Sequence, residues 1–296
     1  MLYRLEDKVT NVKSRVKSDK EYTMENYLNQ FRLDGKSSIV TGGADGLGMF
    51  MGEALASAGS AVAILDVDLA KGEETARRFA SEYGVRARAW ELDVTDRERV
   101  PAVVDQVIDE LGSVDVLLNN AGIWRNVPAE DMAWEDWYDV IDVCMNGTFL
   151  MNQTVAKKSM IPNGGGNIVN IGSVSGMYVN DAPHKCSYNA AKAGVIMLTQ
   201  ALAAEWARYN IRVNCISPCT AKYKRNPNPS KQQKKAWGTI PIGRHAYSSE
   251  LCGALLYLAS DASSFTTGIN LPVDGGDTVW KGMDPIGIIG GPEGNQ

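Results

Sequence analysis

The fold of this chain is decided by residues 41–48, Thr41-Gly42-Gly43-Ala44-Asp45-Gly46-Leu47-Gly48, which follow a short apolar run and precede helix-forming residues. Glycines let the backbone turn tightly and approach a pyrophosphate, whose charge then meets the amides and the positive dipole of a helix start. An ordinary strand-to-helix turn is the alternative interpretation, because the chain contains 29 glycines. Either way, the stretch predicts a strand, a tight turn and a helix.

From Gly35 onward, short apolar runs alternate with longer amphipathic ones, which is typical of βαβ units and a parallel sheet. We expect strands at residues 38–41, 61–66, 87–93, 114–119, 167–171, 212–216 and 270–273. We expect helices at residues 46–58, 69–82, 96–111, 134–159, 188–209 and 249–259, with Asp68, Thr95 and Ser248 as N-caps. The predicted fold class is therefore α/β: a single-domain, Rossmann-type, doubly wound parallel sheet of about seven strands with helices on both faces.

The chain divides into a main domain and two flanking segments. Residues 33–277 form the predicted domain, residues 1–32 an N-terminal extension, and residues 278–296 a tail rich in Gly and Pro. Within the domain, residues 219–245 interrupt the alternation with prolines and lysines, so we expect a substrate lid there. The extension fits an amphipathic helix on a neighbouring subunit or a frayed charged tail. The tail fits disorder or docking on a partner subunit.

Composition excludes several classes of function. The 296 residues carry 30 Lys and Arg against 35 Asp and Glu, a net charge of -5, so no nucleic-acid partner is expected. Five scattered cysteines without Cys-x-x-Cys and only two histidines predict neither a disulfide framework nor a metal site. No apolar stretch reaches the roughly 18 residues that a membrane span needs, and no secretory signal is recognisable. We therefore expect a cytoplasmic protein that binds no membrane.

Polar residues follow several predicted strands, at the edge where the carboxyl ends of parallel strands meet. Asp66 closes the second strand, where a carboxylate accepts hydrogen bonds from a ribose diol and repels a 2′-phosphate. No Arg or Lys lies between Gly42 and Lys71 to offset that repulsion, so NAD is expected rather than NADP. A plain strand-end carboxylate is the alternative interpretation of Asp66. Residues that end the next two strands are candidates for the adenine and its ribose, or are turn residues only: Asp93, Val94, Asn120, Ala121 and Gly122.

Tyr188 and Lys192 are four residues apart in a predicted helix and therefore share one of its faces. An ammonium there stabilises the phenolate, the form that a general base needs. Composition alone predicts about 0.6 such pairs by chance, so the pair gains weight only from its position. Ser173 ends the fifth predicted strand at the same edge of the sheet, and its hydroxyl can hold a substrate oxygen beside the phenol.

Together these motifs resemble the short-chain dehydrogenase/reductase family over about residues 33–277. The motifs follow one another in the order of the family: residues 41–48, Asn119-Asn120-Ala121-Gly122, Ser173, Tyr188-x-x-x-Lys192 and Val273-Asp274-Gly275-Gly276. The resemblance is to the polyol and sugar-acid members, which are similar to gluconate 5-dehydrogenase, and to the 3-oxoacyl reductase-like members. It implies hydride transfer between a nicotinamide and a carbinol carbon, without a metal.

The resemblance also implies roles for single residues. Tyr188 is then the general acid-base, Lys192 also binds the nicotinamide ribose, and Ser173 orients the carbonyl or alcohol. Asn146, in Val143-Cys144-Met145-Asn146-Gly147, matches the helix asparagine that completes the proton relay of the family. The chain departs from the family at Cys219, where a glycine is usual. The implied cofactor contacts are Gly42, Asp45, Gly46, Leu47, Gly48, Asp66, Tyr188, Lys192, Pro218 and Thr220, of which Thr220 stands in for the usual contact to the carboxamide.

The substrate is indicated by the predicted lid. Between Thr220 and Gly243 the chain has six cationic residues and no acidic one, which favours an anionic substrate such as a sugar acid or sugar phosphate. A solvated loop is the alternative. The lid lacks the Leu and Phe stripe expected over an acyl chain or a steroid, so small polar substrates lead. Candidates for substrate contacts are Trp124, Ser175, Asn180 and His184, with core packing as the alternative for Trp124.

We therefore expect an NAD-dependent oxidoreductase that acts on a secondary alcohol or ketone of a sugar, sugar acid or polyol. A 3-oxoacyl-thioester or hydroxysteroid reductase is the alternative within enzymes. A catalytically silent dinucleotide-binding interaction protein is the alternative from another class, and the presence of Ser173, Tyr188 and Lys192 disfavours it. The resemblance implies a homotetramer or homodimer built on the helices predicted at residues 134–159 and 188–209.

Overall fold

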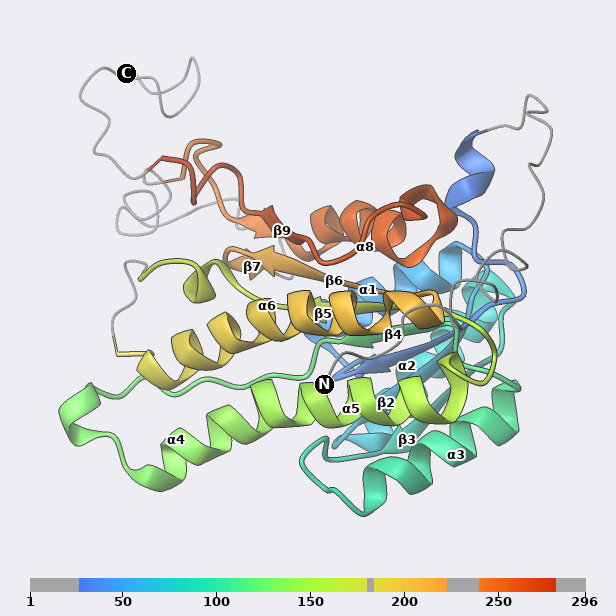
Figure 1. Cartoon of the computed structure of the whole chain (residues 1–296), viewed down its shortest axis with the longest axis horizontal. Helices are drawn as coiled ribbons and strands as arrows, with labels where there is room; N and C mark the ends of the chain where they lie inside the picture. The colour runs from blue at the N-terminus through green and yellow to red at the C-terminus, as the bar shows by residue number, and fades with distance from the viewer. Residues whose placement is uncertain (1–26, 180–183, 223–239, 281–296) are drawn as a thin grey trace, which may run out of the picture.

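The computed structural model describes residues 27–179, 184–222 and 240–280, and its centre is one seven-stranded parallel sheet (Figure 1). The strands lie in the order β3-β2-β1-β4-β5-β6-β9. Their bounds are Ser37–Thr41 for β1, Ala61–Asp66 for β2, Ala87–Glu91 for β3, Val116–Asn119 for β4, Gly166–Ile171 for β5, Ile211–Pro218 for β6 and Asn270–Val273 for β9. The strand order reverses between β1 and β4, where ligands bind in sheets of this kind. The predicted fold class is confirmed.

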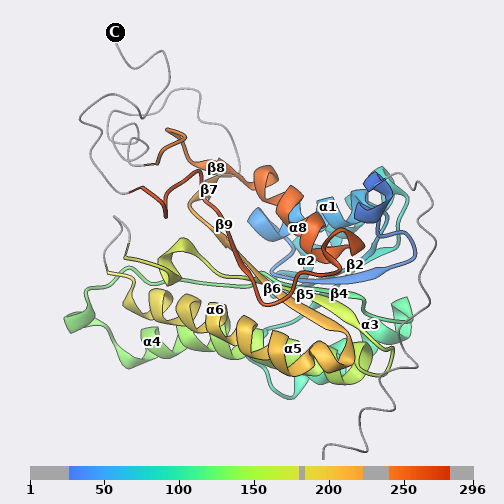
Figure 2. The same ribbon diagram turned by 45° about the horizontal axis from the view of Figure 1, so that its top comes forward.

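Helices cover both faces of the sheet, as Figure 2 shows. One face carries α1 (Gly46–Ser57), α2 (Leu69–Tyr83) and α8 (Cys252–Ala259). The other carries α3 (Arg99–Leu111), α4 (Trp134–Ile141), α5 (Gly147–Val155) and α6 (Cys186–Trp206). Because successive side chains of a strand point to opposite faces, Ile39 joins one apolar cluster and Val40 the other. This burial on two sides explains why the strands are continuous apolar runs in the sequence.

The helix predicted over residues 134–159 is interrupted twice by π-helical turns. One of them, Asp142–Asn146, joins α4 to α5, and the other, Ala156–Met160, follows α5. A π-helical turn holds more residues than an α-helical turn, so it changes the direction in which the following side chains point. Within the first of these turns, Cys144 is buried and Asn146 is exposed.

Two of the three predicted N-caps are wrong. Asp68 is confirmed, because its carboxylate accepts a backbone amide from the first turn of α2 at 3.0 Å. Thr95 does not cap α3, which begins only at Arg99, since the Asp96 carboxylate accepts the Arg99 amide at 2.8 Å. Ser248 is itself the first residue of the short helical turn Ser248–Leu251. The errors are those of helix ends, where neighbouring carboxylates compete for the same amides.

The predicted lid is described only at its two ends. β7 (Ala221–Lys222) and β8 (Ala246–Tyr247) pair in parallel and form a separate two-stranded sheet. Beside them, the Arg244 guanidinium donates two hydrogen bonds of 2.7 Å to the Glu250 carboxylate. Residues 223–239 and 180–183 lie outside the described residues, and so do residues 1–26 and 281–296. The prediction for Asn180 and that for most lid cations therefore remain expectations.

Candidate active site

A cavity of about 530 Å³ lies at the carboxyl ends of β1, β4, β5 and β6, beside the start of α6. Its lining brings together residues from the glycine turn, from the segment after β4, from the end of β5, from α6 and from the segment after β6. Among them are Gly42, Asp45, Gly46, Leu47, Asn120, Ala121, Gly122, Trp124, Ser173, Ser175, Lys185, Tyr188, Lys192, Pro218 and Thr220. Most of the residues predicted for the cofactor, and three of those predicted for catalysis, therefore meet at one place.

The turn from β1 to α1 is built from backbone, as the sequence predicts. Gly42 and Gly46 have φ of +62° and +58°, which residues with a side chain rarely adopt. A Cβ on Gly48 would lie 2.0 Å from the carbonyl oxygen of Gly42, so no larger residue fits. The Asn120 side-chain amide fixes the turn by donating to the carbonyls of Thr41 and Gly42, at 3.1 and 2.9 Å. The turn thus presents backbone and the start of a helix to the cavity, which fits a dinucleotide pyrophosphate.

Asp66 lies next to this turn and is held by two backbone amides. Its carboxylate accepts the amide of Ala44 at 3.0 Å and that of Asp68 at 3.1 Å. The strand-end interpretation is therefore correct, but it does not exclude a ribose contact, because each carboxylate oxygen has more than one lone pair. The two amide contacts fix the orientation of the carboxylate relative to the glycine turn.

The candidates for catalysis lie on α6 and at the end of β5. Lys192 is 3% exposed, and its ammonium donates to the Ile171 carbonyl at 2.6 Å. Its Nζ atom lies 5.6 Å from the centre of the Tyr188 ring. The Ser173 Oγ atom accepts the amide of Ser175 at 3.0 Å, which fixes the side chain at the cavity. The helix spacing of four residues, seen in the sequence, does place the phenol and the ammonium together.

Asn146 does not join this group, which corrects the prediction from the sequence. Its side chain is exposed, donates to Asp142 at 2.6 Å and lines a separate cavity of about 500 Å³ together with Val94. The residue of this helix that lies near the first cavity is Cys144, two positions earlier and fully buried. Residues two apart on a helix point to different sides, so only one of the two can face α6.

Cys144 contacts the segment that follows β4. Its thiol donates to the Ile123 carbonyl at 3.2 Å. A Cβ placed on Gly122 would lie 3.5 Å from the Cys144 sulfur and 3.6 Å from the Lys192 ammonium. The thiol and the ammonium therefore pack against the same glycine. In the sequence, the one indication of this residue is its place two positions before Asn146, in the same predicted helix.

The remaining predicted residues divide between the cavity and other places. Pro218, Thr220 and Ser175 line the cavity, whereas the lining does not include Asp66, Asp93, Val94 or Gly48. Asp93 fixes a turn, since its carboxylate accepts the amide and hydroxyl of Thr95 at 2.9 and 2.8 Å. The predicted adenine contacts of Asp93 and Val94 thus remain expectations at the rim of the sheet.

The candidates for substrate contacts have different positions. Trp124 is 61% exposed and lines the cavity, so the core-packing interpretation of this residue is wrong. The ammonium of Lys185 lies 6.0 Å from the centre of the Trp124 ring. His184 is not part of the lining; it has φ of +69°, and its carbonyl accepts the Val127 amide at 3.0 Å. Lys185 was missed from the sequence, although it stands only three residues before Tyr188.

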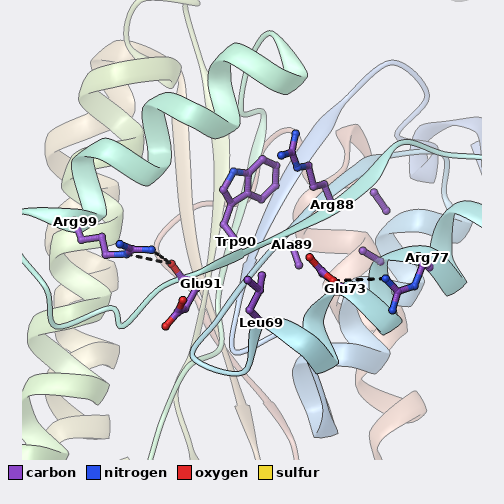
Figure 3. A pocket seen from close by; sticks show the side chains of 10 residues that line it. Leu69, Glu73, Arg77, Arg88, Ala89, Trp90, Glu91 and Arg99 are labelled. Atoms are coloured by element: carbon purple, nitrogen blue, oxygen red, sulfur yellow. Dashed lines mark hydrogen bonds and ion pairs between the residues drawn. The ribbon is translucent and has the colours of Figure 1, made fainter.

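A third hollow, of about 390 Å³, lies between α2 and β3 at the outer edge of the sheet (Figure 3). Arg77 and Glu73 pair there at 3.5 Å, and the Arg99 guanidinium donates to the Glu91 carbonyl at 3.3 Å. Of the predicted site residues that the structure describes, none lines this hollow. The predicted site residues instead gather in the first cavity.

Residues 27–179, 184–222 and 240–280 contain neither a candidate metal site nor a candidate membrane span. No group of three or more His, Cys, Asp or Glu side chains there is suited to hold a metal ion. No helix in those ranges combines the length and the apolar character that crossing a membrane requires.

Comparisons with known proteins give the family context. A family model described as enoyl-(acyl carrier protein) reductase matches residues 42–278. The chain is 39% identical to a ribulose-forming D-arabinitol 2-dehydrogenase of Scheffersomyces stipitis over 278 residues, 88% of this chain and 100% of the relative. A solved gluconate 5-dehydrogenase of Burkholderia cenocepacia, in complex with NADP and tartrate, matches with a TM-score of 0.79 and 37% identity over 85% of this chain and 98% of that one. A solved NAD⁺-bound xylitol dehydrogenase matches with a TM-score of 0.76 and 32% identity over 81% and 98%.

Proposed function

The chain belongs to the short-chain dehydrogenase/reductase family, and from this we propose that it is an NAD(H)-dependent dehydrogenase of a polyol, sugar or sugar acid. The observation that carries the proposal is the common cavity of Ser173, Tyr188 and the buried Lys192 with the glycine turn. The similarity to enzymes named for D-arabinitol and gluconate supports a small polar substrate. The chain is accordingly assigned hydride transfer at a secondary alcohol.

The residues of the chain supply proton transfer and orientation. A bound nicotinamide dinucleotide supplies or accepts the hydride. The Tyr188 hydroxyl gives its proton to the substrate oxygen in reduction, and the phenolate takes it back in oxidation. The Lys192 ammonium, held by the Ile171 carbonyl, stabilises that phenolate. Because the Ser173 oxygen accepts the Ser175 amide, its own proton remains to donate to the substrate oxygen.

Cys144 takes part indirectly. Its thiol holds the Ile123 carbonyl and packs on Gly122, against which the Lys192 ammonium also lies. We therefore assign Cys144, in place of Asn146, as the helix residue that positions the segment beside the ammonium. It is a positioning residue, because its thiol bonds to backbone and not to the reacting groups.

The proposed choice of NAD over NADP rests on Asp66. Its carboxylate is fixed beside the glycine turn, where it can accept the ribose hydroxyls and repel a 2′-phosphate. The solved relatives include one with NADP and one with NAD⁺, so the proposal depends on this side chain and its neighbours.

The proposed homodimer or homotetramer is supported by exposed aromatic side chains on α4. Trp134 and Tyr138 are 68% and 56% exposed, and their rings stack at 5.7 Å. Neighbouring exposed apolar side chains of this size are typical of subunit interfaces. The mass of the protein in solution, measured by light scattering after size-exclusion chromatography, tests this assignment, and a monomer would contradict it.

The proposed activity is tested on the full chain by following nicotinamide absorbance. The panel contains pentitols, hexitols, gluconate, sugar phosphates, a 3-oxoacyl thioester and a hydroxysteroid, each with NAD⁺ or NADP⁺ and the corresponding reduced cofactor for the ketones. We expect turnover of a polyol or sugar acid with NAD⁺. Turnover of the large apolar substrates alone would overturn the proposal in favour of an acyl or steroid reductase.

A further inference from the structure

An ion pair at the edge of the glycine turn has no part in the mechanism above. The Lys71 ammonium, from the first turn of α2, donates to the carboxylate of Asp45, the residue before α1. Asp45 is in the N-cap position, where Asp normally bonds to helix amides, yet it makes no such side-chain bond. The Lys71 ammonium holds the pKa of the Asp45 carboxyl below its usual range. The carboxylate is thus paired chiefly with the ammonium of α2, and the Gly46 amide adds to the lowering of its pKa.

The pair lies beside Asp66, the proposed ribose ligand. The Asp66 carboxylate accepts the amide of Ala44, the neighbour of Asp45, at 3.0 Å. It also accepts the amide of Asp68, whose own carboxylate accepts the Lys71 amide at 3.0 Å. Of the three carboxylates in this group, only that of Asp45 bonds to the ammonium, whereas those of Asp66 and Asp68 bond to neighbouring backbone amides. The group has an excess of negative charge where the adenosine ribose would be held.

Without its pairing to Asp45, the Lys71 ammonium beside the proposed ribose site would favour the binding of NADP over NAD. A phosphate monoester carries a charge of about -1.5 to -2 near neutral pH, and Lys is a common phosphate ligand on a flexible stem. The Lys71 and Asp45 side chains are 46% and 53% exposed, so the ammonium can turn without rearrangement of the core. Its pairing with Asp45 neutralises the charge that a 2′-phosphate would seek, and the Asp45 carboxylate adds repulsion of its own.

We propose that Asp45 excludes NADP by holding Lys71, so that the Asp45–Lys71 pair is a determinant of cofactor choice additional to Asp66. The inference rests on the proposed function, because it concerns the same dinucleotide site. It assigns to Asp45 a role in selection rather than in binding the pyrophosphate. It also assigns to Lys71 a capacity for phosphate binding that the native chain suppresses.

The test uses Asp45→Asn, which keeps the size of the side chain and removes its charge. Dissociation constants are measured for NAD⁺ and NADP⁺, and for 5′-AMP and adenosine 2′,5′-bisphosphate, by calorimetry or by the quenching of tryptophan fluorescence. We expect Asp45→Asn to tighten the two 2′-phosphorylated ligands at least about tenfold relative to their partners, the effect of one new charge-assisted hydrogen bond. Adding Lys71→Met to this variant should remove the gain.

A matched control is Glu73→Gln, which removes a negative charge from the same helix at the exposed Glu73–Arg77 pair. It should leave the ratio of the two affinities within about twofold, because Glu73 pairs with Arg77 and exposed charges are screened by solvent. The inference is overturned if Asp45→Asn leaves the ratio unchanged, or if the gain survives Lys71→Met. Because the readout is binding of adenosine nucleotides, it does not depend on turnover of a polyol. A failure of the proposed substrate class is therefore distinguishable from a failure of this inference.

Discussion

The two sides of the cavity differ in how their chemistry is built. On the side of β1, α1 and β2, polar groups bond to backbone within the site: Asn120 fixes the glycine turn, and Asp66 bonds to the amides of Ala44 and Asp68. On the opposite side, where β5 and α6 supply Ser173 and Tyr188, the lining also carries the exposed side chain of Trp124, at 61% exposure. The first side is suited to a ligand of constant shape, and the second to a substrate that differs among relatives.

The largest effect is expected at the glycine turn, where a substitution should weaken the binding of NAD⁺. In Gly48→Ala the new Cβ would lie 2.0 Å from a backbone oxygen of the turn, so we expect binding of NAD⁺ to weaken at least about 100-fold. In Gly43→Ala the nearest atom is a Val40 methyl at 3.1 Å, which can shift, so binding should change by less than about fivefold. Equilibrium titration of both variants measures the difference, and equal affinities would show that the turn does not form the site.

On the opposite side of the cavity, substitution of Trp124 tests whether the binding of substrate is independent of the binding of NAD⁺. Trp124→Ala removes an aromatic face from the entrance of the cavity, so KM for the preferred substrate should rise about tenfold while the NAD⁺ dissociation constant stays constant. Trp124→Phe retains an aromatic face and should stay within about threefold. Steady-state kinetics at saturating NAD⁺, combined with a direct titration, separate the two quantities. If Trp124→Ala weakened NAD⁺ as much as the substrate, the two sides would not be independent.

The smallest effect is expected at the base of the lid. The Arg244 guanidinium beside Glu250 lowers the pKa of that carboxyl from 4.5 to about 2. A lowered pKa stabilises the folded state above the unfolded value of 4.5, and the contribution is lost as the pH falls toward about 2. Because the pair is more than a third exposed, Glu250→Gln should lower the free energy of unfolding by less than about 1 kcal/mol at neutral pH. Thermal unfolding of both proteins should converge near pH 2, and a difference that grew on acidification would contradict the assignment.

The sheet could be predicted from the sequence because its signals are local. The strands Ala61–Asp66 and Asn270–Val273 have the predicted bounds, since apolar runs and the residues that end them lie next to one another in the chain. The same holds for Tyr188 and Lys192, whose spacing is one helical turn. The predicted strands and helix contacts agree with the structure where they depend on residues that are neighbours in the sequence.

The errors arise where position depends on contacts across the chain. Asn146 has the residue type that the family resemblance calls for. In the structure, however, Cys144, two positions earlier in the π-helical turn Asp142–Asn146, is the residue near Lys192. The Asp45–Lys71 pair joins residues 26 positions apart, and no periodicity predicts which way two exposed side chains turn. Lys185 near Trp124 is a contact of the same kind. The substrate side was therefore predicted less well than the cofactor side.

In the proposed function, the Tyr188 phenol transfers the proton in a site whose dinucleotide is held by other groups. The direct measurement is the rate of hydride transfer in Tyr188→Phe with saturating NAD⁺ and the preferred alcohol, together with the NAD⁺ dissociation constant. The rate should fall about 10²- to 10⁴-fold, the usual contribution of a general acid-base, while the dissociation constant stays within about threefold. A rate within about threefold of that of the native protein, at unchanged NAD⁺ affinity, would contradict the claim.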